Sequence, residues 1–71
     1  MRSGIFEGAD FSGASLSNAE VGRARFAGAV FDGADLRALG LEEADLTGAR
    51  ADAATMWPSG FDPAEHGVRL I

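Results

Sequence analysis

A five-residue period runs through most of this chain, and it limits the possible folds more than any other feature of the sequence. Divided into blocks of five from Gly4, residues 4–58 give eleven blocks, with alanine first in nine of them and a large apolar residue third in ten. In order, the blocks read GIFEG, ADFSG, ASLSN, AEVGR, ARFAG, AVFDG, ADLRA, LGLEE, ADLTG, ARADA and ATMWP. This period matches neither the 3.6-residue repeat of a helix nor the alternation of a long strand.

Each block is expected to form a short extended piece followed by a corner. The first and third residues of a block are two apart, so in extended chain they share one face. The inward pair is then one small and one large residue. Five blocks end in glycine and a sixth ends in Asn18, and these residue types best tolerate the positive φ that a tight corner requires.

Four such blocks, each turning the chain through about a right angle, would close one coil of about twenty residues. Successive coils would stack at the spacing of neighbouring strands, roughly 4.8 Å. Residue n would then lie under residue n+20, which puts Phe6 under Phe26 and Phe11 under Phe31. The expected core is the set of third-position residues: Phe6, Phe11, Leu16, Val21, Phe26, Phe31, Leu36, Leu41, Leu46 and Met56.

Apart from Gly4, which opens the first block, the chain departs from the pattern at Leu39 and Ala51. Leu39 is bulky where alanine is expected, and Gly40 follows it, which indicates either a bulge or bend or a specific contact surface. Ala51 stands at a third position and leaves a thin spot next to Phe31 in the expected core.

Two charge pairs also test the stacking register, because residues twenty apart should be neighbours. Arg25 should lie beside Asp45, and Asp32 should lie unfavourably beside Asp52.

Four blocks, ADFSG, ASLSN, ADLRA and ADLTG, resemble the A(D/N)LXX consensus of the pentapeptide-repeat protein family. The later string WPSGFDP is similar to the WPxGFDP-like closing segment of such proteins. The resemblance implies an all-β fold, a right-handed quadrilateral parallel β-helix with a short C-terminal capping segment. Eleven blocks at four per coil make about 2.75 coils. We expect a single pentapeptide-repeat domain over residues 1–71, with repeats at 4–58 and the cap at 59–71.

The segment after the last block carries turn and helix signals. Pro58-Ser59-Gly60 indicates a turn. Asp62 followed by proline and glutamate is typical of a helix start, and Gly67 would end that single turn. The last coil would otherwise expose its core and its strand edge, so we expect Trp57 and Phe61 to fold over it as a cap.

The N-terminal end has no comparable cap in the sequence. The first coil is therefore expected to show Ile5, Phe6 and its backbone edge to water, although solenoids normally need a polar terminal repeat. Three explanations remain open: two chains stack end to end, a longer natural protein was cut, or the short N-terminal arm suffices. We favour a homodimer formed by end-to-end stacking. An interface at the other end, through Val68, Leu70 and Ile71, is the alternative.

The sequence offers no recognisable catalytic machinery. There is no cysteine and only one histidine, His66, so a thiolate or zinc site is not expected. The glycines fall at repeat corners, and no phosphate-binding loop follows them. We expect His66 to be solvated near the end of the short helical turn. No catalytic, cofactor-binding or metal-binding residue is predicted, and the chain is expected not to be an enzyme.

The net charge and the hydropathy of the sequence argue against several further classes of function. The net charge is −5, which argues against direct nucleic-acid binding because that requires a basic surface. No stretch approaches the roughly 18 apolar residues of a membrane span. A filled interior would leave no room for a small-molecule ligand. We expect a cytoplasmic, bacterial, non-catalytic structural or protein-interaction module whose protein partner the sequence does not identify. The alternative is a DNA mimic that binds a DNA-handling enzyme, because some members of the family resemble DNA and protect gyrase.

Overall fold

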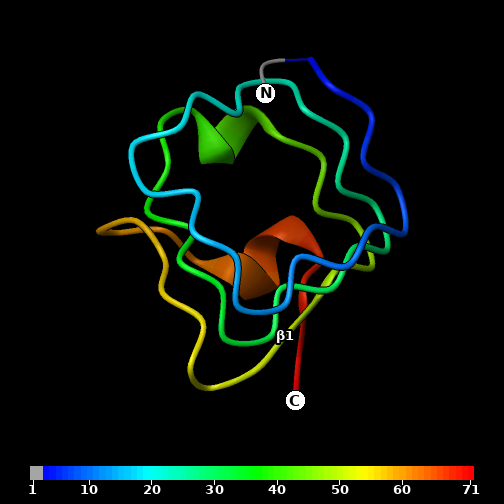
Figure 1. The fold of residues 1–71 in the computed structure, drawn as a ribbon, viewed down its shortest axis with the longest axis vertical. Helices are drawn as coiled ribbons and strands as arrows, with labels where there is room; N and C mark the ends of the chain where they lie inside the picture. Colours follow the sequence, from blue (N-terminus) through cyan, green and yellow to red (C-terminus); the bar gives the residue numbers. More distant parts are fainter. Residues whose placement is uncertain (1–2) are drawn as a thin grey trace.

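The chain winds repeatedly around one axis, and its successive coils superpose in the view of Figure 1. The structure is a computed structural model that describes residues 3–71; Met1 and Arg2, the start of the domain expected over 1–71, lie outside the described residues. Parallel backbone bridges join each coil to the next. Five of them join residues twenty apart: Ile5 to Arg25, Asp10 to Val30, Ser15 to Asp35, Arg25 to Asp45 and Val30 to Arg50.

Regular secondary-structure elements are few and short, because each block is extended for only about three residues before it turns. The described residues form a 3₁₀ helix η1 (Leu41–Glu43), a strand β1 (Arg50–Ala51), a second 3₁₀ helix η2 (Pro63–His66) and a strand β2 (Arg69–Leu70). β1 and β2 pair in parallel, with Arg50 opposite Arg69 and Ala51 opposite Leu70. The C-terminal segment therefore adds one more layer to the stack.

The corners are tight turns closed by a backbone hydrogen bond. The N–H of Ala9 donates to the C=O of Phe6 at 3.1 Å, and the N–H of Ala29 donates to the C=O of Phe26 at 2.9 Å. Gly8 and Gly28, the third residues of these two turns, have φ of 70° and 71°. Positive φ at this place is typical of a type II turn and explains the preference for glycine. Asn18 and Arg23 adopt positive φ at the equivalent corners without that freedom.

The interior is filled by third-position side chains, flanked by the alanines at first positions. The largest fully buried ones are Phe26, Phe31, Leu36, Leu41, Leu46 and Val21. Phe6 stacks on Phe26 with ring centroids 5.4 Å apart, and Phe11 stacks on Phe31 at 5.3 Å. Phe26 and Phe31 meet edge to face at 5.3 Å. Two columns of stacked rings thus interlock with the geometry that aromatic pairs prefer.

The period slips by one residue before η1. Leu39 bridges Glu20, which is nineteen residues away instead of twenty. Ala38 therefore takes the small inward position and is buried, whereas Leu39 points outward and is 59% exposed. The repeat had placed Leu39 inward, and that placement is wrong. Gly40 and η1 then restore the register of the repeat, so that the Leu41 side chain lies in the core again.

Glycine allows two coils to approach closely at this slip. A Cβ atom built on Gly40 would lie 3.1 Å from both the N and the Cα of Gly22, and Gly40 also has a φ of 80°. Any side chain there would push backbone against backbone. The expected bulge near Leu39 is thus accommodated by a pair of glycines, one in each of two neighbouring coils.

A second slip, in the opposite direction, moves Met56 out of the core. Asp35 bridges Met56, twenty-one residues away. The extra residue makes Thr55 the buried first-position residue, and its hydroxyl donates to the C=O of Phe31 at 2.8 Å. Trp57 instead packs against the core. Met56, which the repeat placed in the core, is 44% exposed.

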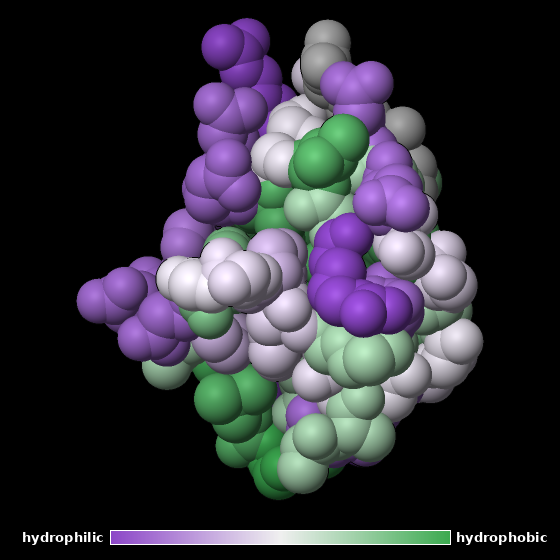
Figure 2. Space-filling model, turned by 90° about the vertical axis from the view of Figure 1, so that its left-hand side faces the viewer, coloured by the Kyte–Doolittle hydropathy of each residue, from purple (hydrophilic) through white to green (hydrophobic). Residues whose placement is uncertain are grey.

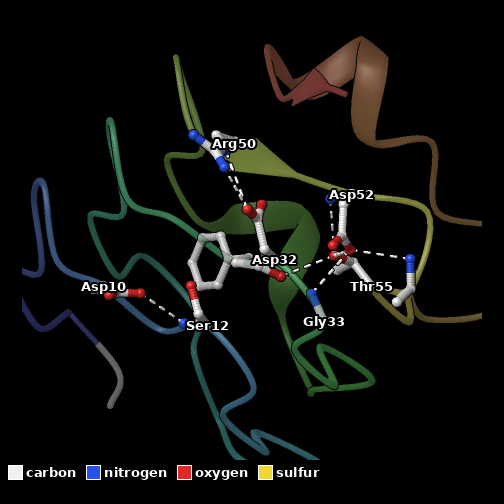
Figure 3. A network of polar contacts seen from close by, with 9 residues as sticks. Asp10, Ser12, Asp32, Gly33, Arg50, Asp52 and Thr55 are labelled. Carbon is white, nitrogen blue, oxygen red and sulfur yellow. Dashed lines mark hydrogen bonds and ion pairs between the residues drawn. The ribbon is translucent and has the colours of Figure 1, made fainter.

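Aspartate has a structural role at several turns. Its carboxylate accepts a hydrogen bond from the N–H two residues further on, as shown for Asp10 and Ser12 in Figure 3. The distances are 2.9 Å for Asp10 and Ser12, 3.1 Å for Asp35 and Arg37, 3.0 Å for Asp45 and Thr47, and 3.0 Å for Asp52 and Ala54. Such Asx turns fix the chain direction as it enters a corner. For Asp10, Asp35 and Asp45, they give a physical reason for aspartate directly after the repeat alanine.

The expected unfavourable pair of Asp32 and Asp52 is relieved by separate partners (Figure 3). Arg50 donates to Oδ2 of Asp32 from Nη2 at 2.7 Å and from Nε at 3.1 Å. Asp52 accepts from the N–H of Gly33 at 2.9 Å. The two carboxylates thus turn toward different donors. The register expected for Arg25 and Asp45 is present, since their backbones form one of the bridges.

The first prediction tests the slip at residues 38 and 39. Leu39→Ala removes an exposed side chain and should change the free energy of unfolding by less than about 0.5 kcal/mol. Ala38→Leu puts three extra carbons into a filled interior and should cost about 1–3 kcal/mol. Chemical denaturation of both variants measures the difference. A larger loss for Leu39→Ala than for Ala38→Leu would restore the uninterrupted five-residue period and contradict the slip.

The second prediction concerns pH. Four aspartate carboxyls have a pKa below the ordinary value of 3.8, because each accepts hydrogen bonds that stabilise its charged form. The main donor is the Ser12 hydroxyl for Asp10 and the Arg37 side chain for Asp35. It is the Thr47 N–H for Asp45 and the Gly33 N–H for Asp52. A lowered pKa in the folded state means that the unfolded chain binds protons first as the pH falls. This contribution to stability is present above about pH 5 and is lost as the pH falls through the folded pKa values.

Thermal unfolding between pH 7 and pH 2 measures this effect. The melting temperature should be level down to about pH 5 and then fall. Replacing all four aspartates by asparagine keeps an oxygen acceptor at each turn but removes the titrating group, so the fall should be shallower. Equal slopes for the variant and the wild-type protein would contradict the assignment.

Candidate interaction surfaces

The first coil has a backbone edge that the described residues leave uncovered. Around Asp10, the bonds to the second coil use the C=O of Ala9, which accepts from Val30 at 2.9 Å, and the N–H of Phe11, which donates to Val30 at 2.7 Å. Consecutive residues of a parallel strand direct their backbone groups to opposite sides. The N–H and C=O of Asp10 therefore point away from the second coil.

Two of the expected interface residues lie at this end. Ile5 is 69% exposed, and Phe6 is partly buried against Phe26. Asp10 adds a charge to the same edge, because the Ser12 hydroxyl and then its N–H lower the pKa of the Asp10 carboxyl. The first-coil edge thus combines open backbone groups, apolar side chains and a carboxylate that is ionised at neutral pH.

Strand β2 presents the corresponding edge at the C-terminal end. The N–H of Arg69 donates to Ala49 at 2.7 Å, and the N–H of Ile71 donates to Ala51 at 3.0 Å. By alternation, the N–H and C=O of Leu70 point away from the stack. Leu70 and Ile71 are 54% and 66% exposed. Figure 2 shows strongly hydrophobic side chains gathered at the lower edge of the molecule, where Figure 1 places the C terminus.

Val68 was named as a possible residue of this interface, but its side chain does not lie on the exposed edge. Its side chain is buried and belongs to the core cluster. The reason is its place in the added layer. Because Arg69 lies opposite Arg50, Val68 lies one residue earlier, at the inward position next to the alanine column. Its N–H donates to the C=O of Pro63 at 3.1 Å, which ties it to η2.

The residues expected to cap the last coil stack on each other. The rings of Trp57 and Phe61 are 5.4 Å apart and nearly parallel, and both side chains pack against the core cluster. η2 follows, with the Asp62 carboxylate accepting from the N–H of Ala64 at 3.1 Å. His66, expected to be solvated, is instead half-buried, with its ring centroid 4.4 Å from that of Phe61. The imidazole thus forms part of the cap.

A surface hollow of about 400 Å³ opens where the period slips. Leu39 and Gly40 form part of its lining, together with Ser3, Glu20, Gly22, Arg23 and Glu43. It mixes one cationic side chain with two acidic ones, so its lining does not select a ligand of one charge. Sequence reasoning did not predict this hollow. The break in the repeat at Leu39-Gly40 was the only signal of it.

A smaller hollow of about 200 Å³ lies beside the cap. Its lining residues are Glu42, Pro58, Ser59, Gly60, Phe61, Asp62, Glu65 and His66. These come from η1 and from the segment around η2, which are distant in sequence. No local pattern brings them together, and this explains why the sequence did not indicate this hollow.

Within residues 3–71, no group of three or more histidine, cysteine, aspartate or glutamate side chains is arranged to hold a metal ion. Among the same residues, no helix has the length and apolar character needed to cross a membrane.

A comparison with protein-family models agrees with the repeat. A family model described as pentapeptide repeats, with eight copies, matches residues 5–38. A crystal structure of a pentapeptide repeat protein from Nostoc Pcc 7120 is 27% identical to the chain, with a TM-score of 0.48; the similarity covers 94% of this chain and 76% of that one. No curated protein matches the sequence.

The matched segment contains the regular blocks of the first two coils, and the same twenty-residue bridges continue beyond it to Arg50. Proteins with these repeats form right-handed β-helices. Over residues 5–38, the chain is thus similar to the pentapeptide repeat family.

Proposed function

We propose that this protein is a non-catalytic module that acts by protein contact, in the cytoplasm, through the ends of its stack. Its repeats would form a quadrilateral stack of about 2.75 coils, in which the repeats alone are roughly 13 Å deep at about 4.8 Å per coil. Pentapeptide repeat proteins are generally structural modules without enzymatic activity. Its partner is a protein, and the simplest one is a second copy of the same chain.

The observation that carries this proposal is the character of the two ends. Each end presents a backbone edge that none of residues 3–71 covers, beside large apolar side chains: Ile5 at one end, and Leu70 and Ile71 at the other. Exposed strand edges with apolar neighbours are surfaces on which another chain can add. Contiguous exposed apolar surface also favours association, because its burial removes it from water.

The sides of the stack differ from its ends in the character of their exposed residues. Their exposed residues are mostly polar and include the ion pairs of Arg37 with Asp35 and of Arg50 with Asp32. Exposed pairs of this kind contribute only about 0–1 kcal/mol to stability, but they keep the surface soluble. Association through the ends would leave these sides accessible to further proteins.

DNA mimicry is the second candidate, and the net charge of −5 favours it. The shape speaks against it. The principal extents are 26 × 23 × 22 Å, so the molecule is about as wide as it is long, whereas a DNA mimic needs an elongated rod. Arginines also break up the acidic surface, since Arg25 lies in register with Asp45 and Arg50 pairs with Asp32.

The third prediction tests association. Light scattering behind size exclusion, over a wide concentration range at physiological salt, should give masses that rise above 7.3 kDa as the concentration increases. The same measurement at high salt should show association retained, because apolar burial is not screened as surface charges are. A single mass of 7.3 kDa at every concentration would contradict association with a second copy.

The fourth prediction separates the two candidate functions. Purified gyrase should supercoil relaxed plasmid at an unchanged rate when this protein is present in large molar excess, because the short stack cannot occupy a DNA-length groove. The control is a plasmid-length DNA competitor, which must slow the reaction in the same assay. Inhibition by the protein that grows with its concentration would favour DNA mimicry over the proposed module.

A further inference from the structure

We propose that the edge of β2 in one molecule takes the first-coil edge around Asp10 of a second copy, so that molecules stack head to tail. The inference rests on the proposed function, and it adds which surfaces meet and in which orientation. It follows from one ladder of parallel backbone bridges that runs through the whole stack. This ladder joins, in order, Asp10, Val30, Arg50 and Arg69.

The two ends of this ladder are complementary in their backbone groups. Within the chain, one ladder step consists of the Val30 N–H donating to Ala9 at 2.9 Å and the Phe11 N–H donating to Val30 at 2.7 Å. At the C-terminal end, the bonds to β1 use Arg69, so Val68 C=O and Leu70 N–H point outward. The Asp10 N–H of the second copy would donate to Val68, and the Leu70 N–H would donate to its Asp10 C=O. This repeats the internal step.

The side chains at this junction are also complementary. The register that pairs Asp10 of the second copy with Arg69 sets a carboxylate beside a guanidinium, and opposite charges on neighbouring strands stabilise pairing. The same register sets Phe11 of the second copy on Leu70, which is more than half exposed. Inside the chain, Phe11 stacks on Phe31 in the same way. A shift of one residue would turn the apolar side chains outward.

Pairing of two like ends fits these residues less well. Two first-coil edges would bring Asp10 against Asp10 of the second copy, and two β2 edges would bring Arg69 against Arg69 of the second copy. Like charges directly opposite each other disfavour strand pairing. Contact between unlike ends is heterologous, and unless it closes into a ring it continues to add molecules. Head-to-tail stacking thus differs measurably from a closed dimer.

The experiment uses two variants of the full chain that each block one end. Leu70→Asp sets a carboxylate against Asp10 and Phe11 of the second copy and blocks the β2 edge. Asp10→Lys sets an ammonium against Arg69 and blocks the first-coil edge. Leu39→Asp is the matched control, because it makes the same change at a similarly exposed leucine on the side of the stack. Circular dichroism and thermal melting first establish that each variant is folded.

Light scattering and sedimentation then compare the variants with the wild-type protein. We expect the wild-type mass to keep rising beyond a dimer as concentration increases, and the control to behave alike. Each blocked variant alone should associate at least about tenfold more weakly. An equal mixture of the two should form dimers and no larger species, since one intact edge of each kind remains. If Asp10→Lys does not fold, Asp10→Asn, which keeps the turn acceptor, takes its place with a smaller expected loss.

Three other outcomes would overturn the inference. If the mass levels off at a dimer that survives Leu70→Asp, the first-coil edges meet each other. If such a dimer survives Asp10→Lys, the β2 edges meet. Either result removes the head-to-tail arrangement but leaves the proposed contact module intact. If the wild-type protein stays at 7.3 kDa throughout, self-association itself fails, and with it this inference.

Discussion

The parallel hydrogen-bonded step between one coil and the next is the interaction on which the rest of this structure depends. Each step joins residues about twenty apart, so no coil is held by local contacts alone. The step also aligns side chains in columns, because residues in register lie directly above one another. The stacked rings of Phe6 on Phe26 and of Phe11 on Phe31 follow from that alignment. Corners, core and ends are all consequences of keeping the step.

The slips at Leu39 and Met56 show which part of the repeat is obligatory. The bridge separation changes to nineteen at Leu39 and to twenty-one at Met56, yet both bridges form. What the chain preserves is the backbone step and an inward small residue, supplied by Ala38 in one case and Thr55 in the other. The number of residues between successive bridges changes where this is needed to keep both. Gly40 favours this at the first slip, because a Cβ there would lie only 3.1 Å from the Gly22 backbone and because glycine tolerates the φ of 80°.

The ladder of backbone hydrogen bonds that builds the body of the protein also leaves its two ends able to bind another strand. A ladder of identical steps has no internal reason to stop, so its terminal residues carry backbone groups directed outward. The C-terminal end is partly closed by Trp57, Phe61 and His66, whose rings stack over the core. β2 then adds a layer but leaves an edge of its own beside Leu70 and Ile71. Function in such a chain is best sought where the repeat ends.

The sequence by itself determined the repeat, the residues of most of the core and the positions of the corners, because each depends on a pattern within five residues. It also indicated the cap, since a turn and a helix start follow the last block. Only the tertiary structure decided that Ala38 faces inward and Leu39 outward, that Met56 is exposed, and that Val68 is buried. These depend on which residue bridges which across a coil. A one-residue change in loop length reverses the side on which a side chain lies, and that length is chosen by the stacking of distant segments and by no local preference.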